Sequence, residues 1–187
     1  MVVIWVVVGI IVVGGALAWL SYNRFVRQRQ LIDNSWSNVD TELKRRYDLI
    51  PNLVATVKGY AAHERDTLEA VVRARSAAVD TNGTAAEQAA QENVLVGALK
   101  QMLALREAYP DLKANVEFLD LQKQLVVTED RIQAARRFYN ANVRDYNTRV
   151  ETFPSMLIAS MGHFDKRDYF EVEPAVRDAG APEVELT

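Results

Sequence analysis

General acid–base catalysis has one candidate pair in this sequence, His63 beside Glu64. Adjacent residues on a helix point in different directions, so this pair lacks the geometry for proton transfer. The chain has no cysteine, which excludes a thiolate nucleophile and a cysteine-based metal site. It also has no HExxH motif, no Glu-x-x-His pair and no glycine loop that cradles phosphate. The sequence therefore predicts no catalytic residues, no metal, no cofactor and no enzymatic activity.

Polar residues gather around a proline in the run "RRYDLIPNLV" (45–54). Arg45 and Asp48, and then Asp48 and Asn52, have the three- and four-residue spacings that meet on a helix. Pro51 lacks a backbone donor, so a helix through it leaves a backbone group free. Two interpretations are open for these residues with Arg46. In the first, Asp48 and Asn52 satisfy the backbone groups freed at a kink, or Asp48 pairs with an arginine. In the second, the residues form a docking surface for a partner or a neighbouring subunit.

A second polar set lies further along, where tyrosine–asparagine pairs repeat after seven residues and therefore share one helix face. Its members are Arg136, Tyr139, Asn140, Tyr146 and Asn147. Buried tyrosine and asparagine side chains need hydrogen-bond partners. Asp48, Asn52 or the arginines supply those partners if the two helices run in opposite directions, which would fix their register. The alternative is that this set faces solvent.

The elements that carry these residues are helical. Apolar residues recur every three or four positions from Ile32 to Val71, and the pattern keeps its phase across Pro51. This favours a kinked helix, or two nearly collinear segments, over about 24–79. A turn at the proline remains the alternative, with Asp48 as the cap of a new helix.

Two further helices are expected after this one. Asn82-Gly83 predicts a turn, and Thr84 with Glu87 fits a capping box. Helices over about 85–108 and 113–153 follow. The first and last long helices would measure about 72 and 61 Å, against about 36 Å for the middle one. The middle helix is too short to cover both, so an end projects or a partner chain covers it.

Residues 2–20 contain no charged residue and are long enough to cross about 30 Å of hydrocarbon. Arg24, Arg27 and Arg29 follow directly, and this basic flank favours an outside N-terminus and a cytoplasmic helical domain at a bacterial inner membrane. A cleaved signal peptide is the alternative, but the basic leading region of such a peptide is missing. With 22 basic and 25 acidic residues, the chain has no basic footprint for nucleic acid.

The segment 155–164 is short and apolar. It would close the bundle end, lie on the membrane or contact another subunit through Met156, Leu157, Ile158, Met161 and Phe164. Residues 165–187 are polar, acidic from Glu171 onward, and have no sustained helical period. We expect this tail to be flexible, or ordered by a partner. The predicted organisation is a transmembrane anchor at 1–22, a helical bundle at 23–164 and an acidic tail at 165–187.

Several longer motifs carry a resemblance. The runs "RRYDLIPNLV" (45–54), "VKGYAAHE" (57–64), "YPDLKAN" (109–115) and "RRFYN" (136–140) are similar to the LemA family. The resemblance implies a membrane-anchored, all-helical antiparallel bundle of bacteria, and it implies no enzymatic activity. From the residues and this resemblance we expect an all-α protein in which a transmembrane helix precedes an elongated antiparallel bundle of three to four long helices.

Two functions remain open on this basis. The first is a self-assembling homo-oligomeric scaffold in the lipid bilayer, with coiled-coil-like contacts between long helices. The second is an adaptor that recruits an unidentified protein partner to the membrane. An enzyme is disfavoured by the missing motifs.

Overall fold

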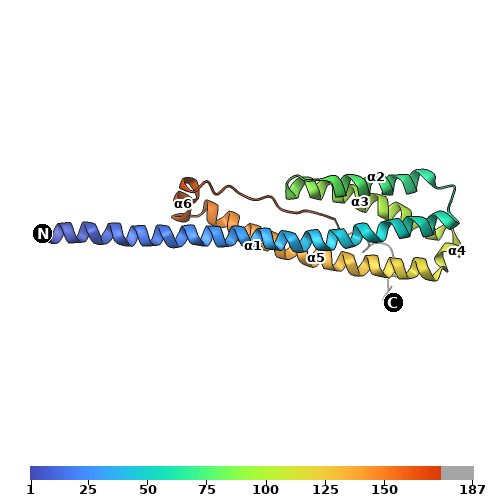
Figure 1. The fold of residues 1–187 in the computed structure, drawn as a ribbon, viewed down its shortest axis with the longest axis horizontal. Helices are drawn as coiled ribbons and strands as arrows, with labels where there is room; N and C mark the ends of the chain where they lie inside the picture. Colours follow the sequence, from blue (N-terminus) through green and yellow to red (C-terminus); the bar gives the residue numbers. More distant parts are fainter. Residues whose placement is uncertain (174–187) are drawn as a thin grey trace, which may run out of the picture.

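The computed structural model describes residues 1–173, which are helical apart from turns and an extended C-terminal segment. No strand occurs in that range (Figure 1). The elements are α1 (Val2–Tyr60), α2 (Arg65–Asp80), α3 (Ala85–Ala104), the 3-10 turn η1 (Leu105–Glu107), α4 (Pro110–Lys113), α5 (Val116–Glu151) and α6 (Ser155–Met161). The expected all-helical class with one long apolar N-terminal helix is confirmed.

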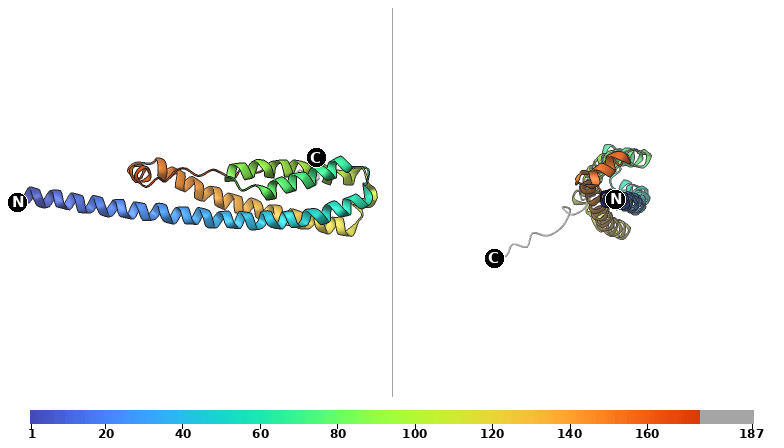
Figure 2. Two further views of the ribbon diagram at one scale, coloured as in Figure 1. Left: turned by 45° about the horizontal axis from the view of Figure 1, so that its top comes forward. Right: turned by 90° about the vertical axis from the view of Figure 1, so that its left-hand side faces the viewer.

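Helices α1 and α5 form the long axis of the molecule, side by side in every view (Figures 1 and 2). The ring of Phe25 lies 6.0 Å from that of Tyr146, and the ring of Trp36 lies 5.2 Å from that of Tyr139. Further along, Arg46 reaches Glu129. The α5 residues in these contacts therefore have lower residue numbers as the α1 residues have higher ones.

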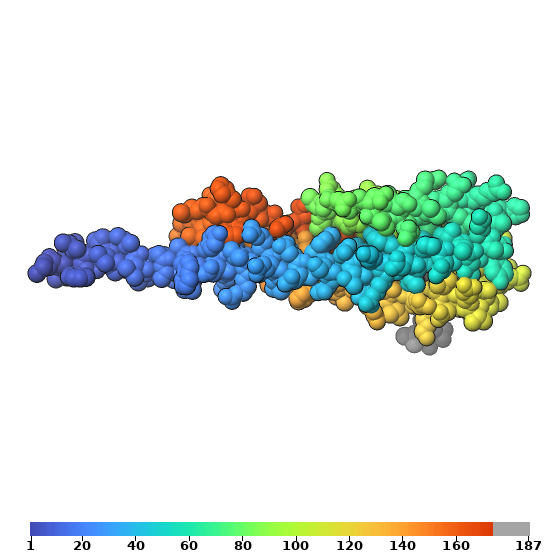
Figure 3. Space-filling view, viewed as in Figure 1, coloured from blue at the N-terminus to red at the C-terminus, as the bar shows by residue number. Residues whose placement is uncertain are grey.

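The first third of α1 stands apart from the rest of the molecule (Figure 3). It holds the only stretch within residues 1–173 that is long and apolar enough to cross a membrane, and none of that stretch is buried. A core helix of similar composition would be covered by other elements. The first α1 side chain that is fully buried is Phe25, and from there buried residues recur along the helix. The apolar span thus continues directly into the packed domain.

The prediction of a kinked helix, or of two nearly collinear segments, over about 24–79 is wrong. Pro51 lies inside α1, but the helix ends at Tyr60, and α2 begins after a turn at 61–64. Arg75 contacts Tyr47, and both lie fourteen residues from Ala61, so α2 runs back along α1. This reversal buries Leu68, Val71, Ala74 and Ala78, which a straight helix would leave in water. Burial, rather than a local breaker, sets the position of the turn.

The α2–α3 hairpin begins its second helix where the sequence predicts. The Thr84 hydroxyl accepts from the backbone N–H of Glu87, while the Glu87 carboxylate accepts from the N–H of Thr84. This reciprocal pair is the expected capping box. Packing of α3 against α2 then covers the half of the α1–α5 pair that is farthest from the span (Figure 1).

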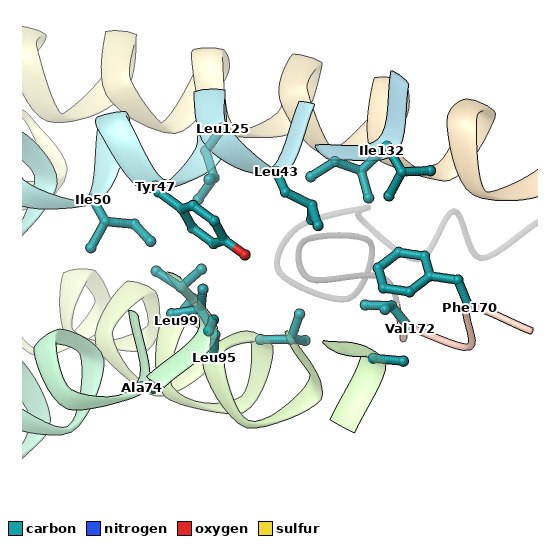
Figure 4. Close-up of a cluster of buried hydrophobic side chains, with 14 of the residues drawn as sticks. Leu43, Tyr47, Ile50, Ala74, Leu95, Leu99, Leu125, Ile132, Phe170 and Val172 are labelled. Carbon is teal, nitrogen blue, oxygen red and sulfur yellow. The ribbon is translucent and has the colours of Figure 1, made fainter. Parts of the chain in front are cut away.

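The C-terminal segment, residues 165–173, covers the other half. It runs extended between α6 and the hairpin, and its Phe170 and Val172 are buried beside Leu43 and Ile132 (Figure 4). One expectation is therefore corrected, because residues 165–173 are part of the packed domain rather than a free tail. That a partner chain covers part of the long helices stays a prediction. Residues 174–187 lie outside the described residues.

Candidate functional site

A buried ionic cluster joins three helices at the centre of the bundle. Arg46 of α1 is fully buried and pairs with Glu92 of α3 and with Glu129 of α5, the latter at 3.2 Å. Arg46 lies three residues after Leu43 and four before Ile50, so it occupies a core position of the α1 stripe. Two carboxylates face one guanidinium, which leaves one negative charge to be stabilised by neutral donors.

Three neutral side chains supply those donors. The Tyr47 hydroxyl donates to Glu92, as does Gln88 Nε2 at 2.9 Å, and Gln133 Nε2 donates to Glu129 at 2.7 Å. Gln88 Nε2 also donates to the carbonyl of Ala78 at 3.0 Å, which extends the network to α2. Burial, reinforced by the neighbouring Glu92, raises the pKa of Tyr47, so this phenol remains a donor at all physiological pH values. The cluster thus connects all four helices of the bundle.

This cluster holds the helices together and is closed to a substrate. Arg46 and Glu92 have no exposed surface and Glu129 has 4%, so a substrate has no access to the charges. The acid–base candidate His63 is exposed, and Glu64 instead accepts from the Tyr109 hydroxyl at 3.2 Å. In the described part of the chain, no group of three or more histidine, aspartate or glutamate side chains is arranged to hold a metal ion.

The proline in α1 has a different partner from the one expected. A helix residue normally donates to the carbonyl four positions earlier, and Pro51 cannot, so the Tyr47 carbonyl is free. Arg75 Nε of α2 donates to that oxygen at 2.8 Å. Asp48 and Asn52 are exposed instead of capping the kink. The free carbonyl is therefore the point at which α2 is fastened to α1.

The two arginines of the motif have separate roles. Arg46 is the central cation of the cluster, whereas the Arg45 side chain is 51% exposed and lies 3.4 Å from Glu42. Adjacent residues on a helix point about 100° apart, which explains why one is buried and the other is not.

Asparagine side chains hold the C-terminal segment to the bundle. The amide of Asn147 donates to the Arg167 carbonyl and accepts from the Arg167 N–H, each at 2.9 Å. Asn140 makes the same pair of bonds with Phe170, at 3.0 and 2.9 Å. Asn93 of α3 bonds the Glu171 carbonyl and the Glu173 N–H. Each amide acts as a strand neighbour would, so an extended chain is satisfied without a sheet.

Two more residues of the predicted polar seam bond the same segment, so their hydrogen-bond partners are not the α1 side chains expected, although the rings of Tyr139 and Tyr146 pack on α1. The Tyr139 hydroxyl donates to the Asp168 carbonyl at 3.0 Å, and Arg136 donates to the Val172 carbonyl. Burial raises the pKa of Tyr139 to about 12, although Arg167 opposes the shift. Burial also raises the pKa of Tyr146, whose ring packs on Phe25.

The predicted interface segment divides into two sides. Phe164 is buried and stacks on Phe25 with a 4.8 Å ring separation, and Ile158 is partly buried. Met156, Leu157 and Met161 are exposed. The segment therefore closes one end of the bundle and also presents an apolar side outward. The three arginines after the span, Arg24, Arg27 and Arg29, are exposed on α1 beside this end.

Sequence reasoning missed Gln88, Glu92 and Glu129 as members of a site. The signal was present, because Glu129 lies four residues after Leu125 and three before Ile132, in the middle of an apolar stripe. A charge at such a position needs a buried partner. Asn93 and Arg75 gave no comparable signal, since their partners are backbone groups far away in the sequence.

Comparisons with known proteins place the sequence in a family. The sequence model of the LemA family matches residues 35–186. The chain is 29% identical over 140 residues to Protein LemA of Metamycoplasma hominis, covering 73% of this chain and 63% of that protein. It is 26% identical over 181 residues to Magnetosome protein MamQ of Magnetospirillum gryphiswaldense, covering 83% of this chain and 66% of MamQ. Magnetosome protein MamQ 1 of Paramagnetospirillum magneticum matches over the same shares. The chain thus spans slightly less than two thirds of the length of these relatives.

Proposed function

The chain belongs to the LemA family, and from that premise we propose that it is a non-enzymatic, single-pass membrane protein that serves as a self-assembling scaffold. In this proposal the packed domain is an antiparallel bundle on the cytoplasmic side of a bacterial inner membrane. The observation that carries it is the continuity of α1, in which the apolar span and the buried Arg46 belong to one helix. The ionic cluster fixes the bundle relative to that helix, so the domain stands as a rigid body on the membrane.

The surface available for assembly is the outward side of α5. Leu119, Val126, Val127 and Phe138 are each at least 39% exposed, and they lie opposite the buried stripe of the same helix. Exposed Lys123, Asp130 and Arg137 lie on the same face, so the contact that we propose combines these apolar side chains with charged ones of both signs. Anchoring in one bilayer confines copies to two dimensions, which makes weak contacts sufficient.

Membrane anchoring also determines how two copies meet. Copies inserted in one bilayer with the same topology have their α5 helices pointing in the same direction, so a symmetric pair is related by an axis along the membrane normal. Such a contact places a residue of α5 near the same residue of the second copy. The chain has no native cysteine, so a single introduced thiol reports this contact without interference.

The test is oxidative cross-linking of Val126→Cys and Phe138→Cys in membranes. We expect disulfide-linked dimers on non-reducing gels at both positions. Val94→Cys on α3 is the matched control, because Val94 is 58% exposed but lies on the α2–α3 hairpin. Equal cross-linking at Val94, or a monomer mass for the native protein in mild detergent, would contradict the scaffold.

A second candidate function is the adaptor, favoured by one surface feature. A groove of about 690 Å³ lies between α1 and α2, lined by apolar Val54, Leu68 and Val72 and by basic Lys58 and Arg65. An acidic amphipathic helix of a partner has complementary chemistry. Loss of a co-purified protein in Val72→Asp, which changes a groove residue that is 48% exposed, with the oligomeric mass unchanged, would favour the adaptor over the scaffold.

A further inference from the structure

The short helix α6 lies at the end of the bundle nearest the membrane span. Among described elements, only α1 extends beyond it toward the N-terminus (Figures 1 and 3). The left view of Figure 2 looks nearly along the α6 axis while α1 runs across the page, so α6 crosses α1 instead of following it. A span that crosses a bilayer close to its normal would therefore place α6 near the membrane plane.

Aromatic packing fixes the depth at which α6 meets α1. Phe164, which follows α6, stacks on Phe25 at 4.8 Å and contacts the ring of Tyr22 at 5.3 Å. Gly162 makes this turn available, because a Cβ there would lie 2.5 Å from the Phe164 ring. The last apolar residue of the span is Leu20, and the rise from Leu20 to Phe25 is about 7.5 Å. That rise matches the thickness of the headgroup region, which adds about 5–8 Å on each side of the hydrocarbon core.

The outward side of α6 has the composition of such a helix. Met161 is 79% exposed, Leu157 53% and Met156 45%, and Phe153 before the helix is 72% exposed. The inward side carries Ala159, which is buried against the bundle. These four large apolar side chains would all be in water if the bundle end were held away from the bilayer, which is costly.

Cations lie beside the buried aromatic rings where the chain after α6 meets α1. The Arg29 guanidinium lies 5.7 Å from the centre of the Phe164 ring, and that of Arg149 lies 5.9 Å from the centre of the Phe25 ring. Arg24 is close enough to Arg149 that, after burial, it is the next cause lowering the Arg149 pKa. Two like charges this close favour an anion between them, and lipid phosphates lie at this depth.

We propose that α6 is an interfacial membrane helix, whose Met156, Leu157 and Met161 side chains enter the boundary between headgroups and acyl chains. The arginines of α1 and α5 bind the lipid phosphates above it. The bundle then rests on the bilayer at two places, the span and α6, and this second contact prevents the domain from tilting away from the membrane surface. The proposal depends on the membrane span alone and is independent of self-assembly.

The test uses full-length single-cysteine variants reconstituted into vesicles of phosphatidylcholine and phosphatidylglycerol. A bimane fluorophore is attached to Leu157→Cys or Met161→Cys, and a nitroxide quencher is carried on the lipid acyl chain near the headgroup. Leu17→Cys, inside the span, is the lipid-exposed reference. Val94→Cys is the matched control, an exposed apolar position on α3. We expect quenching at 157 and 161 comparable to that at 17, and none above background at 94.

Two results would overturn the proposal. If the lipid-borne nitroxide quenches the fluorophores at 157 and 161 no more than the one at 94, and their emission is not blue-shifted, α6 lies in water. A blue-shifted emission that the lipid does not quench assigns the same side chains to a contact with a second copy. Circular dichroism of each labelled variant confirms that the helical signal is retained, so every outcome refers to the folded protein.

Discussion

Replacement of Arg46 by methionine is the sharpest test of the buried cluster. The change keeps much of the side-chain length and removes the guanidinium that pairs with both Glu92 and Glu129. Breaking a buried ion pair by removing one partner costs about 3–5 kcal/mol, because an uncompensated charge stays in the interior. A loss of that size lowers the folding equilibrium constant by roughly 150- to 5,000-fold. We expect Arg46→Met to lower the unfolding free energy by this amount.

The adjacent arginine is the matched control. Arg45 is half exposed and lies 3.4 Å from Glu42 one turn earlier, and exposed pairs of this kind contribute about 0–1 kcal/mol. Both variants change Arg to Met on the same turn of α1, so propensity and net charge cancel in the comparison. Urea unfolding in mild detergent, followed by circular dichroism and by Trp36 fluorescence, gives the midpoint and slope for each.

A rescue separates charge from packing. Glutamine at positions 92 and 129 keeps an acceptor and a similar volume but removes both negative charges. Combined with Arg46→Met, these changes should recover most of the lost stability, because replacing a whole ionic set costs far less than breaking it. Equal losses of unfolding free energy in the Arg45 and Arg46 variants would refute the conclusion that the charges of the cluster stabilise the fold. A triple variant no more stable than Arg46→Met alone would refute it too.

Four other changes test the remaining features. Arg75→Met should cost about 1–3 kcal/mol by leaving a buried carbonyl unpaired, and Pro51→Ala should reduce that cost by restoring a backbone donor; additive urea midpoints would contradict this. Asn147→Asp should increase hydrogen exchange in the C-terminal segment, since a carboxylate cannot donate to the Arg167 carbonyl. Unchanged exchange would contradict the role of Asn147 in holding this segment. The raised pKa of Tyr139, about 12, means that its contribution to stability is full below pH of about 10 and is lost as pH rises toward 12; Tyr139→Phe should flatten this decline in unfolding experiments. A reporter after Thr187 should indicate the cytoplasm, and a periplasmic signal would reverse the topology.

Local patterns predicted the parts of the fold that depend on local chemistry. The apolar span, the capped start of α3 and the apolar stripe of α5 all follow from residue spacing, because each arises within a few helical turns. The turn after Tyr60 was missed because the sequence there has no proline and its one glycine, Gly59, lies within α1. The same periodicity fits a straight helix and a helix that folds back. Only the burial gained against α3 distinguishes the two.

The C-terminal segment shows a second limit of sequence reasoning. Its composition is mostly that of a solvated tail, and it has no sustained helical period. Its order within residues 165–173 comes from the burial of Phe170 and Val172 and from asparagine amides on α3 and α5, which bond its backbone. The only pattern that this leaves in the described part of the segment is the short alternation of Phe170 and Val172 with Glu171 and Glu173. The repeated asparagines of α5 were noticed as a polar set, but their spacing could not identify an extended chain as the partner.

Tyr47 connects the carbonyl freed at Pro51 with the buried ionic cluster, and all of these α1 residues lie in the run 45–54. Its carbonyl is freed by Pro51 and binds Arg75 of α2, while its hydroxyl donates to Glu92 of α3. Arg46, the preceding residue, holds the same carboxylate and reaches α5 through Glu129. Two consecutive residues of α1 thus fasten the three other helices of the bundle. Because α1 also carries the apolar stretch, this turn couples that stretch to α2, α3 and α5, in addition to the aromatic contacts that Phe25 and Trp36 make with α5. The proline is therefore more than a tolerated kink, since it exposes the carbonyl that makes the first of these attachments.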